Sequence, residues 1–238
     1  ILRNEEFDIL VNTAAYTAVD QAEEDRDRAW MINAAAPEEM AVICEEKRAL
    51  LIHISTDYVF GKNSNKPLSE NDELEPINHY GATKLLGENS IRKNTKNHII
   101  IRTSWLYGLS GNNFPKTMLS LAKKKENLQV VYDQVGNPTF ADDLAVAIRE
   151  ICKNYNPDQH HGTYHFSNEG VCSWYDFALS IFEMKGISVK VEPVTSEVFP
   201  TKAERPPFSV LNKKKIKDTF DIKIRHWREA LSDFSEEY

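Results

Sequence analysis

The chain has 238 residues, enough for one large domain or for a core domain with a smaller region attached. Its composition, 41% hydrophobic and 27% charged, is ordinary for a globular protein, and no apolar run approaches the roughly eighteen residues that span a bilayer. The net charge of −7 gives no electrostatic reason to expect nucleic-acid binding, since phosphate contacts need a concentrated basic surface. We therefore expect a cytoplasmic protein with neither a membrane nor a nucleic acid as partner.

The first half of the chain alternates apolar runs with helical patterns. The runs at 7–12, 50–54 and 98–103 predict three strands, and their continuous apolar character is typical of parallel strands buried on both faces. A polar, helix-rich segment up to about Arg48 and a helix that begins near Tyr80 separate them. This order predicts an α/β fold with a doubly wound parallel sheet.

The helix expected between the first two strands carries an apolar stripe with a period of about 3.6 residues. The stripe consists of Ala29, Trp30, Ala36, Met40, Ile43 and Cys44. Asn33 interrupts it, and a polar amide on a buried face needs hydrogen-bond partners. Either Asn33 is a satisfied core asparagine, or it orders a water or a backbone group near a reacting centre.

Beyond Ser104 the elements become shorter and turn signals more frequent. Helices are predicted at 114–125, 142–153 and 173–184, and strands at 128–131, 163–166 and 189–191. The last third contains several prolines, and we expect it to form a smaller region at the carboxyl edge of the sheet, where α/β folds bind ligands. We therefore expect a dinucleotide-binding core over residues 1–140 and a mixed region over 141–238, which completes the core and forms the substrate-binding region.

A dinucleotide-binding sheet normally opens with a strand, a glycine-rich turn and a helix whose N-terminus faces the pyrophosphate. Neither G-x-G-x-x-G nor G-x-x-G-x-x-G occurs in the sequence. Either the chain does not bind a dinucleotide, or the first two strand-helix units of such a sheet are absent from it.

Cysteines and basic clusters indicate no special site. Cys44, Cys152 and Cys172 are odd in number and lack metal-ligand spacing, so we expect reduced thiols in the core and no metal site. The densest basic clusters, at 123–125 and 213–217, are most simply solvated faces of helices.

Tyr80 and Lys84 stand four residues apart at the start of a predicted helix and therefore share one face. An ammonium beside a phenol favours the phenolate and lowers the pKa of the tyrosine, which makes proton transfer feasible near neutral pH. Thr56 follows a predicted strand, and a hydroxyl and a phenol aimed at one oxygen stabilise a developing alkoxide. The pair alone also fits a surface helix, and Tyr58 with Lys62 repeats its spacing in a predicted loop.

Six segments together resemble a known family. They are residues 12–20, 55–60, 80–84, 102–107, 133–139 and 205–211. In this order they resemble dTDP-4-dehydrorhamnose reductase, a family of extended short-chain dehydrogenases/reductases, over nearly the whole chain. The resemblance implies a Rossmann-like fold that reduces the C4 ketone of dTDP-4-dehydrorhamnose (dTDP-4-dehydro-6-deoxy-L-mannose) to dTDP-L-rhamnose, with NADPH or NADH as cofactor.

The resemblance also implies roles for the matching residues. The catalytic residues would be Thr56, Tyr80 and Lys84, with Tyr80 as general acid and Lys84 also holding the nicotinamide ribose. The cofactor would be lined by Ala14, Ala15, Tyr16, Thr17, Tyr80 and Lys84. The dTDP-sugar substrate would be bound by Thr56, Asp57, Trp105 and Arg205, with Arg205 near the diphosphate. A homodimer and a Mg²⁺ ion at a subunit contact stay open.

Two other interpretations remain. The beta subunit of methionine adenosyltransferase is similar to these reductases, so a non-catalytic regulatory subunit is one alternative. Another nucleotide-sugar reductase, epimerase or dehydratase of the same fold is the second, although no Asp-Glu pair of the dehydratase type follows Thr56. The presence of Tyr80, Lys84 and Trp105 together with Thr56 favours the reductase.

Overall fold

The computed structural model describes residues 1–61 and 64–238. Its centre is a parallel sheet in the strand order β1-β2-β3-β8, formed by Ile9–Asn12, Leu50–Thr56, His98–Thr103 and Gly162–His165. Every residue of β3 is buried, and so is all of β2 except one residue. This confirms the α/β fold with a parallel sheet that the continuous apolar runs predict.

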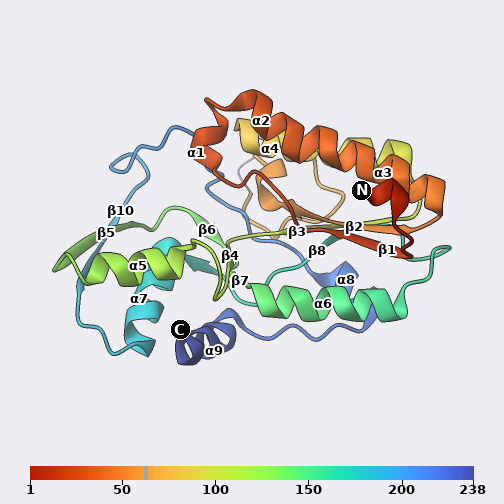
Figure 1. Cartoon of the computed structure of the whole chain (residues 1–238). Helices are drawn as coiled ribbons and strands as arrows, with labels where there is room; N and C mark the ends of the chain where they lie inside the picture. Colours follow the sequence, from red (N-terminus) through yellow and green to blue (C-terminus); the bar gives the residue numbers. More distant parts are fainter. Residues whose placement is uncertain (62–63) are drawn as a thin grey trace.

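Helices cover both faces of this sheet (Figure 1). On one face lie α2 (Arg26–Trp30), α3 (Ala36–Lys47) and α4 (His79–Asn94), and on the other lie α6 (Ala141–Asn154) and α8 (Lys214–Phe220). Successive residues of β3 point to opposite faces, so Ile100 packs with Ala41 of α3 whereas Ile99 and Ile101 pack with Leu144 of α6.

The segment before β2 is more irregular than its pattern suggests. A short helix α1 (Val19–Ala22) precedes α2, and a π-helical turn, η2 (Met31–Ala35), joins α2 to α3. Such a turn changes the phase between the helical segments on its two sides. The prediction that Trp30 belongs to the core is therefore wrong, since its side chain is 48% exposed.

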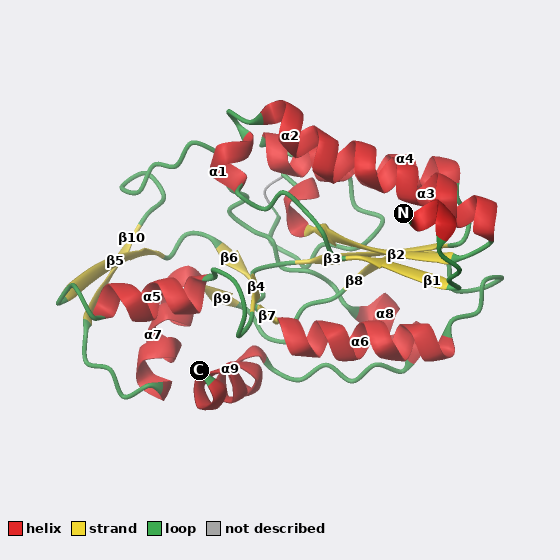
Figure 2. Cartoon of the chain, in the orientation of Figure 1, coloured by secondary structure: helices red, strands yellow, loops and turns green. Residues whose placement is uncertain are grey.

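A smaller region extends from one end of the sheet (Figure 2). There α5 (Phe114–Ala122) and α7 (Trp174–Met184) pack near the parallel pair β5 (Asn127–Val131) and β10 (Lys190–Val194), and α9 (Trp227–Glu237) packs against α7. Phe177, Phe182 and Phe234 belong to its core. Two short pairings complete it: β4 (Leu106–Tyr107) with β7 (Thr139–Phe140), and β6 (Val135–Gly136) with β9 (Cys172–Ser173).

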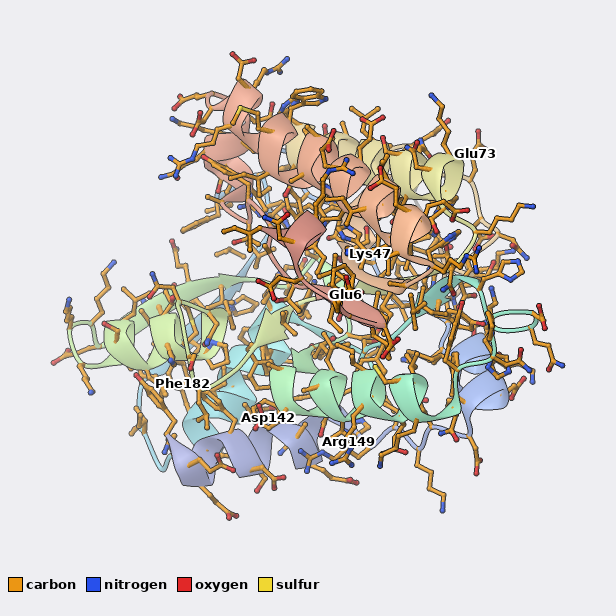
Figure 3. The ribbon with its side chains drawn as sticks, turned by 45° about the vertical axis from the view of Figure 1, so that its right-hand side comes forward. Glu6, Lys47, Glu73, Asp142, Arg149 and Phe182 are labelled. Atoms are coloured by element: carbon orange, nitrogen blue, oxygen red, sulfur yellow. The ribbon has the colours of Figure 1, made fainter. Side chains whose placement is uncertain are left out.

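The remaining expectations concern thiols and charged side chains. All three cysteines are free, and Cys44 and Cys172 are buried, as expected. The cluster at 123–125 is exposed, whereas Lys213 is buried and pairs with Glu169 at 3.3 Å, so the solvated-face prediction is wrong for Lys213. Figure 3 shows typical surface pairing, with Lys47 near Glu6 and their charged atoms 3.6 Å apart.

Residues 1–61 and 64–238 contain neither a membrane-spanning helix nor a cluster of metal-ligating side chains. None of the helices there is both long enough and apolar enough to cross a membrane. No three or more His, Cys, Asp or Glu side chains in these ranges are grouped to hold a metal ion.

Candidate active site at the carboxyl end of β2

The start of α4 is fixed by a cap and by a close backbone approach. The Asn78 side chain accepts a hydrogen bond from the Gly81 backbone N–H at 2.8 Å, which satisfies a free donor of the first turn. A Cβ on Gly81 would lie 2.1 Å from the Tyr58 carbonyl oxygen, so this position requires glycine. These contacts hold Tyr80, in the same turn, against the end of β2.

Tyr80 and Lys84, two of the predicted catalytic residues, lie on the face of α4 that is directed at β2. The third, Thr56, lies on β2. The Tyr80 phenol lies close enough to the Thr56 side chain for the hydroxyl of Thr56 to influence its pKa. One turn later, the buried Lys84 Nζ donates to the Ile54 carbonyl oxygen at 2.7 Å. The structure thus brings Thr56, Tyr80 and Lys84 together, while Lys62 of the second Tyr-Lys pair lies outside the described residues.

The pKa of Tyr80 moves in the direction opposite to the prediction. Burial raises the pKa of Tyr80 to about 12, with the nearby Thr56 side chain opposing this shift and the Asp57 carboxylate adding to it. Lys84 does not lower the pKa of the phenol, because its ammonium is directed at the Ile54 carbonyl. Tyr80 therefore keeps its proton at neutral pH, which suits a general acid.

Asp57 is a buried carboxylate beside Thr56. The Thr56 hydroxyl donates to Asp57 Oδ1 at 3.1 Å, and the Ser209 side chain also hydrogen-bonds the carboxylate. Asp57 Oδ2 has no hydrogen-bond partner among the described residues. An unpartnered buried oxygen next to Thr56 and Tyr80 is an acceptor for a ligand hydroxyl.

Burial raises the pKa of Asp57 to about 7, so this carboxyl should make stability depend on pH. The value in the unfolded chain is about 3.9, and the folded state therefore holds the proton more tightly. The contribution of Asp57 to the free energy of unfolding is fully present below pH ~4. It is lost as the pH rises through about 7, and this loss amounts to roughly 2–4 kcal/mol. Urea unfolding between pH 4 and 8 should show this decrease in the free energy of unfolding of the native protein. The decrease should be absent in Asp57→Asn. If the free energy of unfolding falls with pH equally in both proteins, the assignment to Asp57 is contradicted.

Trp105 and Ser209 both pack against Gly136. The Trp105 ring stacks on Trp174 with 3.6 Å between centroids, and its backbone has a φ of +48°, which is rare for a bulky residue. A Cβ on Gly136 would lie 2.7 Å from the Trp105 ring and 2.8 Å from Ser209 Oγ. The glycine in the segment 133–139 thus allows Trp105 and Ser209 to approach each other.

Arg205 lies at the border of two cavities, of about 620 and 260 Å³, which also share Gln134. Its guanidinium pairs with Asp20 at 2.7 Å and hydrogen-bonds the Tyr58 side chain. The Tyr58 ring meets the Tyr80 ring edge to face, with 5.7 Å between centroids. Arg205 is therefore one side chain away from Tyr80, beside open volume.

The loop 14–17 follows β1 at the same sheet edge. Ala14 and Thr17 are exposed, and the backbone of Tyr16 is held on both sides by Asn33, which accepts from its N–H at 2.8 Å and donates to its carbonyl at 3.1 Å. Asn33 also donates to Thr83 Oγ1 at 3.2 Å, next to Lys84 in sequence. Asn33 is thus both a satisfied core asparagine and an anchor for this loop.

Several residues that line or support the site were not predicted from the sequence. They are Asn12, His53, Glu88, Arg102 and Ser209. Glu88 had a usable signal, since it continues the four-residue spacing of Tyr80 and Lys84 along one helix face. Ser209 had none, because its contact with Asp57 joins segments far apart in the chain.

A phenol and a lysine one turn apart on a helix, beside a hydroxyl at the end of a parallel strand, define the class of short-chain dehydrogenases/reductases. Within this class the family can be named. The model of the RmlD substrate binding domain matches residues 1–238, and the chain belongs to this family.

Individual relatives agree with this assignment. The chain is 45% identical to the spore coat polysaccharide biosynthesis protein SpsK of Bacillus subtilis (strain 168), over 97% of this chain and 79% of that protein. It is 42% identical to dTDP-4-dehydrorhamnose reductase of Escherichia coli (strain K12), over 93% and 76%. The crystal structure of a dTDP-4-dehydrorhamnose reductase from Bacillus anthracis in complex with NADP superposes with a TM-score of 0.91 at 41% identity, over 97% and 81%.

Proposed function

We propose that this protein reduces the C4 ketone of dTDP-4-dehydrorhamnose to dTDP-L-rhamnose with NADPH or NADH. The observation that carries the proposal is the placement of Tyr80 beside Thr56, one helical turn from the buried Lys84. The relatives named dTDP-4-dehydrorhamnose reductase support the substrate, and the relative solved with NADP supports the cofactor. The hypothesis of a regulatory subunit offers no reason for a protonated phenol beside a hydroxyl at this edge.

Each of the side chains at the site has its own role in the proposed reaction. The cofactor, when bound, supplies the hydride for the ketone carbon. Tyr80 donates its proton to the carbonyl oxygen, which completes the alcohol, and Thr56 is the second hydroxyl directed at that oxygen. Lys84 and the loop 14–17 would hold the cofactor.

Substrate recognition would use the groups around Asp57. The free Oδ2 of Asp57 accepts a sugar hydroxyl, and Arg205 binds the diphosphate beside the two cavities. Trp105, next to Ser209, limits the space for the sugar.

The test is to follow NADPH absorbance with the protein expressed from its complete coding sequence and dTDP-4-dehydrorhamnose as substrate. We expect oxidation of NADPH only in the presence of the ketosugar, with dTDP-rhamnose as product. NADH in a parallel assay decides the cofactor preference. Absence of turnover together with co-purification of a synthetase would support the regulatory-subunit alternative instead.

Three further parts of the proposal concern organisation. We propose residues 1–140 as the dinucleotide-binding core and 141–238 as the region that completes it and binds substrate; the position of β8 in the central sheet supports the mixed character of the second part. A cytoplasmic location is tested by cell fractionation. A homodimer is tested by light scattering with and without Mg²⁺.

A further inference from the structure

Glu88 is a fully buried carboxylate in the middle of α4. Arg102 of β3 contacts both of its oxygens, with Nε 3.0 Å from Oε1 and the second nitrogen 2.8 Å from Oε2. Arg92 donates to Oε2 at 2.6 Å, and the Ser55 hydroxyl donates to Oε1 at 2.5 Å. Two guanidiniums and a hydroxyl thus satisfy this anion.

Glu88 extends the contact between α4 and β2 that begins at Tyr80. Tyr80, Lys84 and Glu88 occupy one helix face at four-residue intervals. Tyr80 lies beside Thr56, Lys84 donates a hydrogen bond to the Ile54 carbonyl, and Glu88 accepts one from Ser55. Ile54, Ser55 and Thr56 are consecutive residues of β2. The hydrogen bond between Ser55 and Glu88 therefore affects how Thr56 and Lys84 are positioned.

We propose that Glu88 is a positioning residue for the reductase site: its fixed negative charge keeps Lys84 protonated, and its bond to Ser55 fixes α4 on β2. The consequence for turnover rests on the proposed function, whereas the effect on the charge of Lys84 does not. The residue touches no reacting atom and acts through Lys84 and Ser55.

Electrostatics support this role. Burial lowers the pKa of Lys84 to about 8, and the charge of Glu88 opposes that shift. Burial alone would raise the pKa of Glu88, but Arg102, Arg92 and Ser55 hold it at about 2, so Glu88 is an anion at every working pH. The titratable side chain in contact with Lys84 is His53 on β2, with its Nε2 3.2 Å from Lys84 Nζ.

His53 cannot replace Glu88 as the partner of the ammonium. The Ala14 N–H can only donate, so the Asn12 oxygen faces it and Asn12 Nδ2 donates to His53 Nδ1 at 3.0 Å. Burial lowers the pKa of His53 well below its usual value, and the neutral ring therefore carries its proton on Nε2, facing Lys84. A donor facing an ammonium is unfavourable, which leaves the Ile54 carbonyl and the Glu88 charge as the favourable interactions of Lys84 among the described residues.

The experiment follows the ¹³C shift of the Lys84 side-chain Cε against pH in protein labelled with [ε-¹³C]lysine, assigned by its loss in Lys84→Arg. Glu88→Gln preserves the shape and removes the charge, and the titration midpoint of Lys84 should fall by about one pH unit. The matched control is Glu70→Gln. Glu70 also lies near Arg102 and accepts from the His165 N–H at 3.1 Å, but its charge does not act on Lys84, so the midpoint should stay unchanged.

Further variants keep the proposal testable if Glu88→Gln does not fold. Glu88→Gln combined with Arg102→Met removes the buried pair as a whole and should still lower the midpoint, whereas Glu88→Asp should restore much of it. An unchanged midpoint in a folded Glu88 variant would overturn the proposal.

In turnover assays, the alkaline limb of the plot of kcat against pH should shift to lower pH in Glu88→Gln, together with the titration midpoint of Lys84. If the native protein reduces no ketosugar, the proposed function fails, and the titration still decides the role of Glu88.

Discussion

Tyr80→Phe is expected to lower kcat for the ketosugar by about 10²- to 10⁴-fold, because the substitution removes the proton donor and little else. Burial raises the pKa of the phenol to about 12, so it is protonated at neutral pH, and it lies beside the Thr56 hydroxyl. NADPH binding should be nearly unchanged, since Lys84 keeps its contact with the Ile54 carbonyl. Steady-state kinetics and fluorescence titration of NADPH measure the two effects separately.

Tyr58→Phe is the matched control for this variant. Tyr58 packs edge to face on Tyr80, but its side chain hydrogen-bonds Arg205. We expect a higher KM for the dTDP-sugar and a much smaller change in kcat than in Tyr80→Phe. Equal losses of kcat in both variants would contradict the assignment of proton delivery to Tyr80.

The positions of Thr56, Tyr80 and Lys84 within their own elements could be predicted from the sequence, because they depend on local rules. Helical spacing places Lys84 one turn from Tyr80, and the end of a parallel strand places Thr56 at the ligand edge. The direction of the Lys84 ammonium could not be predicted, because it depends on a carbonyl of another element, Ile54. The expected sign of the Tyr80 pKa shift was wrong because burial of the phenol raises its pKa, and that burial depends on tertiary packing.

The fold shows a similar division between local and tertiary information. Strands β2 and β3 are continuous apolar runs and were visible in the sequence, whereas β4, β6, β7 and β9 have only two residues each and no period to detect. The helix α9 was overlooked although Trp227, Ala230, Leu231 and Phe234 repeat at helical spacing and are buried. The π turn η2 had no signal, because a turn of this kind depends on the packing of Asn33 between Tyr16 and Thr83.

The largest loss of stability is expected for Arg102→Leu, at about 3–5 kcal/mol, because it removes one partner of a buried ion pair. Arg102 is 1% exposed, contacts both oxygens of Glu88 and lies over the Phe60 ring with 5.1 Å to its centroid. Leucine would leave the buried Glu88 carboxylate with Arg92 as its only guanidinium partner among the described residues. Urea unfolding at pH 7 gives the free energy of unfolding for both proteins.

Arg149→Leu on α6 separates this effect from the general loss of an arginine (Figure 3). Arg149 pairs with Glu150 at 3.2 Å, but its side chain is 63% exposed, and exposed pairs contribute only about 0–1 kcal/mol. We therefore expect Arg149→Leu to change the free energy of unfolding by less than about 1 kcal/mol. Glu88→Gln combined with Arg102→Met should be less destabilised than Arg102→Leu, because no uncompensated carboxylate remains in the core. If the double variant is instead less stable than Arg102→Leu and Arg149→Leu, the packing of the Glu88 and Arg102 side chains stabilises the core more than the balance of their charges does.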